Sequence, residues 1–254
     1  MKFKTVFSIL GLVLVLFIGV PIAQMLVSAS PQALVETGGE TDVQVSILLT
    51  MRASLWATIA ALLTGVPLAY LLARKRFRGK KIVEGIVDLP VIVPHTAAGI
   101  ALLSVWGRQS LIGKATGLSI MGTETAIAMG MFFVSASFLV NAVKEGFKLV
   151  DERFEKTAVT LGATPWKAFL TVSLPMVKKS ILSGSIMMWG RGISEFGAVV
   201  ILAYHPMTAP VLIFERFQNF GLKYATPVTV LLVGISLLVF IGLRMLEDRK
   251  TGKS

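Results

Sequence analysis

Stretches of about 20 consecutive apolar residues recur through this sequence and limit what it can fold into. Each stretch is long enough to cross the hydrocarbon core of a bilayer, about 30 Å thick, as an α-helix. Lipid offers backbone groups no hydrogen-bonding partners, so open sheet is excluded. Only 15% of the 254 residues are charged, whereas a soluble domain carries about 25%. The sequence therefore predicts an all-α membrane protein.

We expect six transmembrane helices in one membrane domain that covers residues 1–254. The expected spans lie at about 6–27, 45–73, 86–106, 125–143, 181–203 and 226–245. Lys2 and Lys4 precede the first span, which also fits a secretory signal peptide cleaved near Ala29. Its apolar run exceeds the usual signal-peptide core of about 7–15 residues, so we expect this span to be retained.

The distribution of charge predicts the orientation. Lys and Arg beside spans prefer the cytoplasm. Six follow the second span between positions 74 and 81, and seven follow the fourth between 144 and 179. The opposite loops carry Glu36, Glu40 and Asp42 with few basic residues. We therefore expect both termini in the cytoplasm. The net charge of +11 does not indicate nucleic-acid binding, because basic cytoplasmic loops beside anionic lipid account for it.

Small residues form a stripe along the second span. Ala57, Ala61, Gly65, Ala69 and Ala73 recur every four residues, a spacing that lets helix backbones approach closely in lipid. The stripe fits packing within the chain, and it also fits a mobile contact along a pathway or across a subunit interface.

The third span opens with two prolines, Pro90 and Pro94, which disfavour a straight helix. A kink at a helix end and a broken segment that lines a substrate path both explain them. In the second case Pro94 marks the break and Thr96 is a polar contact. We expect His95 to be structural and not catalytic.

The fifth span contains two charges, Arg191 and Glu195, four residues apart on one helix face. Charges inside a span are expensive and face a partner or an aqueous cavity. They fit a structural ion pair, or a pathway or gate position together with Ser194.

The loop between the fourth and fifth spans predicts two short helices joined at a glycine. Gly162 suits a left-handed residue after the first helix. Thr164 can cap the second helix, with Pro165 at its first position and Pro175 limiting its length. An amphipathic helix lying on the lipid surface is the alternative.

This loop resembles the EAA motif of binding-protein-dependent ABC importer permeases. Ala158, Gly162, Val172, Leu174 and Pro175 match the motif spacing, and Gly-Ala-Thr-Pro-Trp is typical of the family. Lys156 occupies the position of the motif's Glu, with Glu155 one residue earlier, and Thr157 replaces the first Ala. The run from Ser194 to Ala198 resembles a segment of molybdate, tungstate and sulfate permeases, with Ser194 in place of a Gly.

The resemblance implies a multi-pass permease subunit in the plasma membrane of a prokaryote. It implies a homodimer with the pathway between its two copies, two cytoplasmic ABC ATPase subunits and an extracytoplasmic oxyanion-binding protein, in contact with membrane lipid. The EAA loop would be the coupling helix that seats in the ATPase. Its implied residues are Glu155, Thr157, Ala158, Leu161, Gly162, Ala163, Thr164, Pro165 and Trp166.

The implied cargo is molybdate or tungstate, with sulfate or thiosulfate as the alternative. We expect no enzyme activity, cofactor or metal, because the sequence has no phosphate-binding loop of the form GxxxxGK[ST] and no Cys. Other membrane classes fit less well. An intramembrane protease needs a nucleophile beside a base, and His95 is the only His in a span. A channel or secondary transporter would not need the loop.

Overall fold

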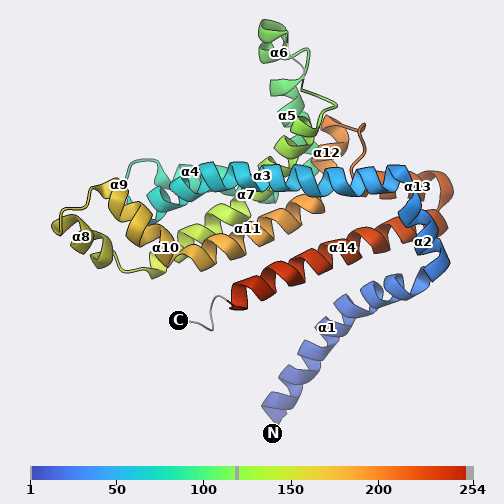
Figure 1. The fold of residues 1–254 in the computed structure, drawn as a ribbon, viewed down its shortest axis with the longest axis horizontal. Helices are drawn as coiled ribbons and strands as arrows, with labels where there is room; N and C mark the ends of the chain where they lie inside the picture. The colour runs from blue at the N-terminus through green and yellow to red at the C-terminus, as the bar shows by residue number, and fades with distance from the viewer. Residues whose placement is uncertain (1, 118–119, 250–254) are drawn as a thin grey trace.

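Helices form almost the whole chain. The computed structural model describes residues 2–117 and 120–249, and these residues contain no strand (Figure 1). The helices in chain order are α1 (Lys2–Ser28), α2 (Pro31–Gly39), α3 (Thr41–Arg74), α4 (Lys80–Ile92), α5 (His95–Trp106), α6 (Leu111–Thr116), α7 (Glu124–Leu149), α8 (Arg153–Thr160), α9 (Pro165–Ala168), the π-helix η1 (Phe169–Ser173), α10 (Leu174–Met176), α11 (Lys178–Ile193), α12 (Gly197–Leu202), α13 (Ala209–Phe220) and α14 (Leu222–Arg249).

The core of the protein is the bundle of α3, α7 and α11, which run along the long axis of the molecule (Figure 1). The small-residue stripe of α3 lies in this core. Ala57, Ala61 and Ala69 are buried, and a Cβ at Gly65 would lie 3.0 Å from Val140 Cγ2 on α7. On α11, a Cβ at Gly184 would lie 3.0 Å from Ala142 Cβ. The stripe therefore packs within the chain, because small residues let these helices approach closely.

The six predicted spans are confirmed only in part. Within residues 2–117 and 120–249, four helices are long and apolar enough to cross a membrane, namely Phe3–Ser28, Thr41–Arg74, Glu124–Leu149 and Leu222–Met245. The third predicted span is instead a bent pair, in which Lys80–Ile92 (α4) and His95–Ala115 (α5 and most of α6) meet at 117°. The prediction of a continuous fifth span at 181–203 is wrong, because the helix stops at Ile193 and restarts as α12 at Gly197.

The bend between α4 and α5 follows from Pro94. Pro90 lies inside α4, and Pro94 caps α5 with extended ψ of 133°. A residue before proline is pushed out of the helical region, and Val93 accordingly has ψ of 131°. The chain therefore leaves the helix at Val93 and starts a second helix in a new direction.

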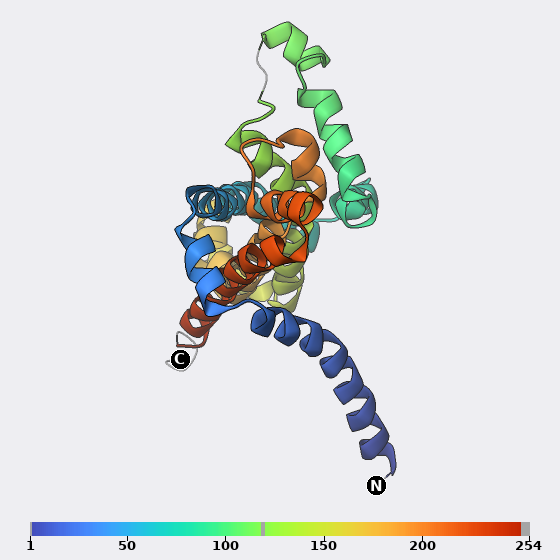
Figure 2. The ribbon, with the colours of Figure 1, turned by 90° about the vertical axis from the view of Figure 1, so that its right-hand side faces the viewer.

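Two segments project from the bundle in opposite directions, α1 on one side and α5 with α6 on the other (Figures 1 and 2). The apolar window of α1 is 0% buried within the chain, and α1 packs on α14. Such a surface is suited to lipid or to another membrane protein and not to water.

Ion pairs tie the elements at the end of the bundle that carries α2 and α13. Arg216 on α13 binds Glu40 and, at 2.9 Å, Asp42. Burial lowers the pKa of Arg216, but the hydrogen bonds to Glu40 and Asp42 outweigh this effect and raise it overall. In the same region Arg52 Nε donates to Glu124 Oε1 at 2.7 Å and joins α3 to the start of α7. The loop with α8 and α9 lies at the other end (Figure 1).

Candidate functional site

The loop between α7 and α11, residues 150–177, has the helix–glycine–helix form predicted from the sequence. Gly162 follows α8 with φ of +92°, a region that favours glycine. The hydroxyl of Thr164 accepts a hydrogen bond from Lys167 N at 3.2 Å and caps α9, and Pro165 is the first residue of that helix. The predicted positive φ and helix cap are both confirmed.

A π-helical turn lets the second helix continue into Pro175. Proline has no N–H and its ring clashes with the carbonyl four residues earlier. In η1 the backbone widens, so that Leu174 N donates to Phe169 O. The helix ends at Met176, close to Pro175 as predicted, and Val177 is its C-cap.

The tip of the loop exposes large apolar side chains. Leu161 is 83% exposed and Trp166 is 68% exposed, whereas no residue of α8 is fully buried. These two side chains lie outside the four apolar helices that are long enough to span a membrane, so they are available to a partner. The other predicted loop residues surround this tip, and they are exposed Thr157, Gly162, Thr164 and Pro165 and half-buried Ala158 and Ala163.

Glu155 turns away from this exposed surface. Its Oε1 accepts a hydrogen bond from Arg74 Nε at 2.9 Å, and its Oε2 accepts one from Tyr70 O–H at 2.9 Å. Lys156, which occupies the acidic position of the motif, is 75% exposed and lies 3.4 Å from Glu152. The loop's acidic residue thus has its contacts within the chain.

A second candidate site forms where the two broken helices meet. Oε2 of Glu195, in the break between α11 and α12, lies 3.0 Å from Arg191 Nη2 and 3.1 Å from His95 Nδ1 at the start of α5. Its Oε1 accepts a hydrogen bond from Ala198 N at 2.9 Å and so caps α12. Glu195 is completely buried, but the side chains of Arg191 and His95 are 23% and 36% exposed.

Glycines allow this close approach. A Cβ at Gly197 would lie 2.8 Å from His95 Cβ, and a Cβ at Gly99 would lie 2.9 Å from Ala198 O. Either substitution would push α5 and α12 apart and open the cluster.

The structure brings together most of the residues predicted for a pathway. Arg191, Glu195 and Ser194 touch, since Arg191 Nη1 donates to Ser194 Oγ at 3.3 Å. Pro94 forms the bend, and Thr96 N lies near Gly197. The prediction treated His95 as a lone residue, and the structure instead places it against Arg191 and Glu195. One feature of the sequence pointed to both residues. His95 directly follows the helix-breaking Pro94, and Glu195 follows Gly190 and Gly192, so both lie where a helix can be interrupted.

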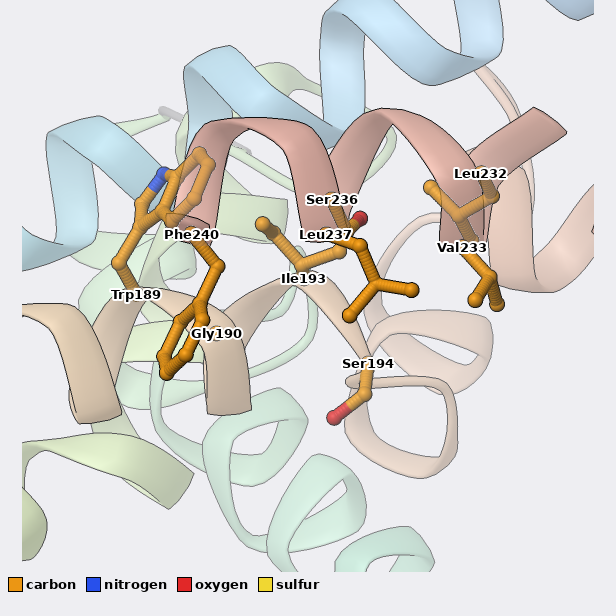
Figure 3. Close-up of a pocket in the computed structure, with 9 residues that line it drawn as sticks. All are labelled: Trp189, Gly190, Ile193, Ser194, Leu232, Val233, Ser236, Leu237 and Phe240. Atoms are coloured by element: carbon orange, nitrogen blue, oxygen red, sulfur yellow. The ribbon is translucent and has the colours of Figure 1, made fainter. Parts of the chain in front are cut away.

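The groove beside Ser194 is apolar. It has a volume of about 280 Å³, lies between α11 and α14, and is lined mainly by aliphatic and aromatic side chains (Figure 3). None of its lining residues carries a charge. The groove therefore offers no charged group to a ligand. Among the described residues, no three His, Asp or Glu side chains gather to hold a metal ion.

Comparison with known proteins identifies relatives over nearly the full length. The family described as the binding-protein-dependent transport system inner membrane component matches residues 65–252. The molybdate/tungstate transport system permease protein WtpB of Thermococcus kodakarensis is 44% identical over 246 residues, which are 96% of each chain. A probable sulfate transport system permease protein of Chlorokybus atmophyticus is 32% identical and covers 79% of this chain and 73% of its own.

Solved structures share the fold. A bacterial alginate ABC transporter, crystallised in complex with an alginate pentasaccharide-bound periplasmic protein, superimposes with a TM-score of 0.77 at 14% identity. The match covers 98% of this chain and 96% of that one. At this identity the likeness concerns the fold alone.

Proposed function

Because this chain belongs to the family of binding-protein-dependent transport system inner membrane components, we propose that it is the permease subunit of an ABC importer for molybdate or tungstate. The assignment of the cargo rests on the 44% identity, over 96% of both chains, to a molybdate/tungstate permease. The protein is a multi-pass component of the plasma membrane.

The loop of residues 150–177, which we call the coupling loop, docks on the partner that supplies energy. Its exposed Leu161 and Trp166 would enter a groove of a cytoplasmic ATPase. Gly162 sets the angle between the two helices that frame this contact. ATP is hydrolysed by the ATPase, and this chain acts as a transport subunit without a nucleotide site of its own.

Two copies of the chain form the pathway in this proposal, and the cluster of His95, Arg191 and Glu195 faces it. The groups that an oxyanion would prefer, Arg191 and His95, are partly exposed, and the carboxylate of Glu195 lies buried behind them. A passing dianion is attracted by Arg191, while Glu195 offsets much of that attraction. The resulting weak binding suits a conduit, because a tight site would slow release.

Sulfate is the second candidate cargo, and the 32% identity to a sulfate permease supports it. Molybdate, tungstate and sulfate are tetrahedral oxyanions of similar size and equal charge. The binding protein that delivers the cargo is therefore expected to make most of the choice.

The test reconstitutes the permease with its ATPase and binding protein in proteoliposomes. Uptake of tungstate and molybdate should require ATP and the loaded binding protein, and calorimetry of the binding protein should rank tungstate, molybdate and sulfate. A binding protein that takes sulfate alone would transfer the assignment to sulfate. Uptake that persists without the ATPase would contradict the importer itself.

A further inference from the structure

We propose that Tyr70 and Arg74 are positioning residues that fasten the coupling loop to α3 through Glu155. In this arrangement Glu155 acts inside the subunit and does not contact the ATPase. The inference rests on the proposed function, because it assigns the route by which movement of the coupling loop reaches the membrane helices. We call Tyr70, Arg74 and Glu155 the clamp.

Both carboxylate oxygens of Glu155 are used within the clamp. One accepts from Arg74 Nε and the other from Tyr70 O–H, each at 2.9 Å. The side chains of Arg74 and Glu155 are only 5% and 14% exposed. Hydrogen bonds to charged groups are stronger than neutral ones, and a covered ion pair is screened little by salt. Glu155 can still accept further hydrogen bonds, but its side chain is 14% exposed, so little of it is open to a partner outside the subunit.

Aromatic packing fixes the geometry of the clamp. The ring of Tyr70 lies edge-on to Phe147 at the end of α7 and to Phe169 in η1, with centroid distances of 5.2 and 4.9 Å. Trp166 of the exposed tip stacks on Phe169 at 5.7 Å. Phe169 thus connects Trp166, at the tip of the coupling loop, to Tyr70 on α3.

The helix α3 connects the clamp to the rest of the bundle. It has no break between Thr41 and Arg74. Away from the clamp, Ser54 Oγ donates to Trp189 O on α11 at 2.7 Å, and Thr50 Oγ1 accepts from Ala209 N of α13 at 2.8 Å. A displacement of the loop that is transmitted through the clamp would therefore reach α11 and α13 through α3.

The test measures how strongly the loaded binding protein stimulates ATP hydrolysis in the reconstituted complex. Tyr70→Phe removes one hydroxyl and keeps the aromatic packing, and Glu155→Gln removes the charge. We expect each variant to lower the stimulation about tenfold, within the range usual for coupling between distant sites. The amount of ATPase that copurifies should stay unchanged.

Matched controls separate the clamp from general effects. Tyr224→Phe alters a tyrosine that is 54% exposed, and Glu145→Gln alters a glutamate that pairs with Lys148 at an exposed site. Both should keep normal stimulation. The charge exchange Arg74→Glu with Glu155→Arg should recover more stimulation than either single change.

Two results would overturn the inference. If Tyr70→Phe and Glu155→Gln both couple normally while the unaltered complex imports tungstate, the clamp has no role and the proposed function stands. If Glu155→Gln loses the ATPase and Tyr70→Phe is silent, Glu155 contacts the ATPase directly. Failure of the unaltered complex to use ATP for uptake would instead contradict the proposed function.

Discussion

Among single residues, Gly162 is required for its backbone conformation and not for lack of space. Its φ is +92°, and a Cβ placed there would meet no atom within 4 Å. Space is therefore available for a side chain, and only the left-handed conformation opposes one. That conformation costs an ordinary L-residue about 1–2 kcal/mol, and asparagine tolerates it best.

We expect Gly162→Val to lose ATPase binding and uptake while the permease still inserts into the membrane. Gly162→Asn should retain clearly more of both. Copurification of the ATPase and uptake of tungstate provide the measurements. Gly85→Val is the control, since Gly85 lies in α4 with negative φ and no atom near its Cβ position. Equal activity of the Val and Asn variants would show that the conformation of Gly162 is unimportant.

Glu195 has two separable roles, a charge beside Arg191 and a cap on α12. Glu195→Gln keeps an oxygen for Ala198 N but removes the charge, so it should disturb coupling of ATP hydrolysis to uptake more than stability. Glu195→Ala removes both roles and should lower stability further, by about 1–3 kcal/mol for the lost hydrogen bonds of a charged group. Thermal unfolding in detergent and the ATP consumed per tungstate imported distinguish the two. Equal loss of stability in both variants would show that the charge and the capping role of Glu195 cannot be separated.

Sequence reasoning placed the charged residues correctly but could not find their partners. Arg191 and Glu195 are four apart and do pair, although Glu195 lies in the break after α11 and not on the same helix as predicted. The partners His95 and Tyr70 are 100 and 85 positions away from Glu195 and Glu155. Only the packing of α5 on α12 and of the loop on α3 brings them together. The helix breaks next to His95 and Glu195 mark these segments in the sequence but do not show that the segments pack on each other.

At the scale of helices, the seam between α3 and α7 depends on small side chains. A larger residue at Gly65 would collide with Val140. We expect Gly65→Leu to lower stability by about 1–3 kcal/mol, as overpacking does, and Val140→Ala to restore part of the loss. Thermal unfolding in detergent measures both. Gly19→Leu on α1, where no atom lies within 4 Å of the Cβ position, should leave stability unchanged. A similar loss of stability there would show that the effect of Gly65→Leu does not come from close packing of α3 on α7.

Helix breaks were predictable to different degrees. Pro90 and Pro94 indicated the break in the third span, because proline acts on its own neighbours in the chain. The break after Ile193 has no proline. It depends on Glu195, which caps α12 in the folded protein while contacting His95 of another helix. Such a break arises from tertiary contacts, so periodicity and composition describe the segment as one span.

At the scale of the whole molecule, the orientation is open to direct measurement. Glu40 and Arg216 form an ion pair, so the α2–α3 junction and α13 share one end of the bundle. Gly79 and Lys167 belong to the end that contains the coupling loop. Single cysteines at 40, 117 and 219 should react with an impermeant reagent in intact cells, whereas those at 79 and 167 should react only after lysis. A reactive cysteine at 79 in intact cells would reverse the orientation.

The architecture followed from the sequence more reliably than its details. Long apolar stretches predicted an all-helical membrane protein, because lipid leaves the backbone few alternatives. The number of uninterrupted spans did not follow, since hydropathy averages over a segment and does not detect a turn within it.

The bend at Val93 has a consequence for biogenesis. The helices α4 and α5, of 13 and 12 residues, are about 20 and 18 Å long at 1.5 Å per residue. Each is shorter than the hydrocarbon core, so neither can leave the translocon alone as a stable span. The helix α5 packs on α12, which is synthesised about 100 residues later. We therefore expect α4 and α5 to reach their final positions by folding after insertion, and not by partitioning into lipid on their own.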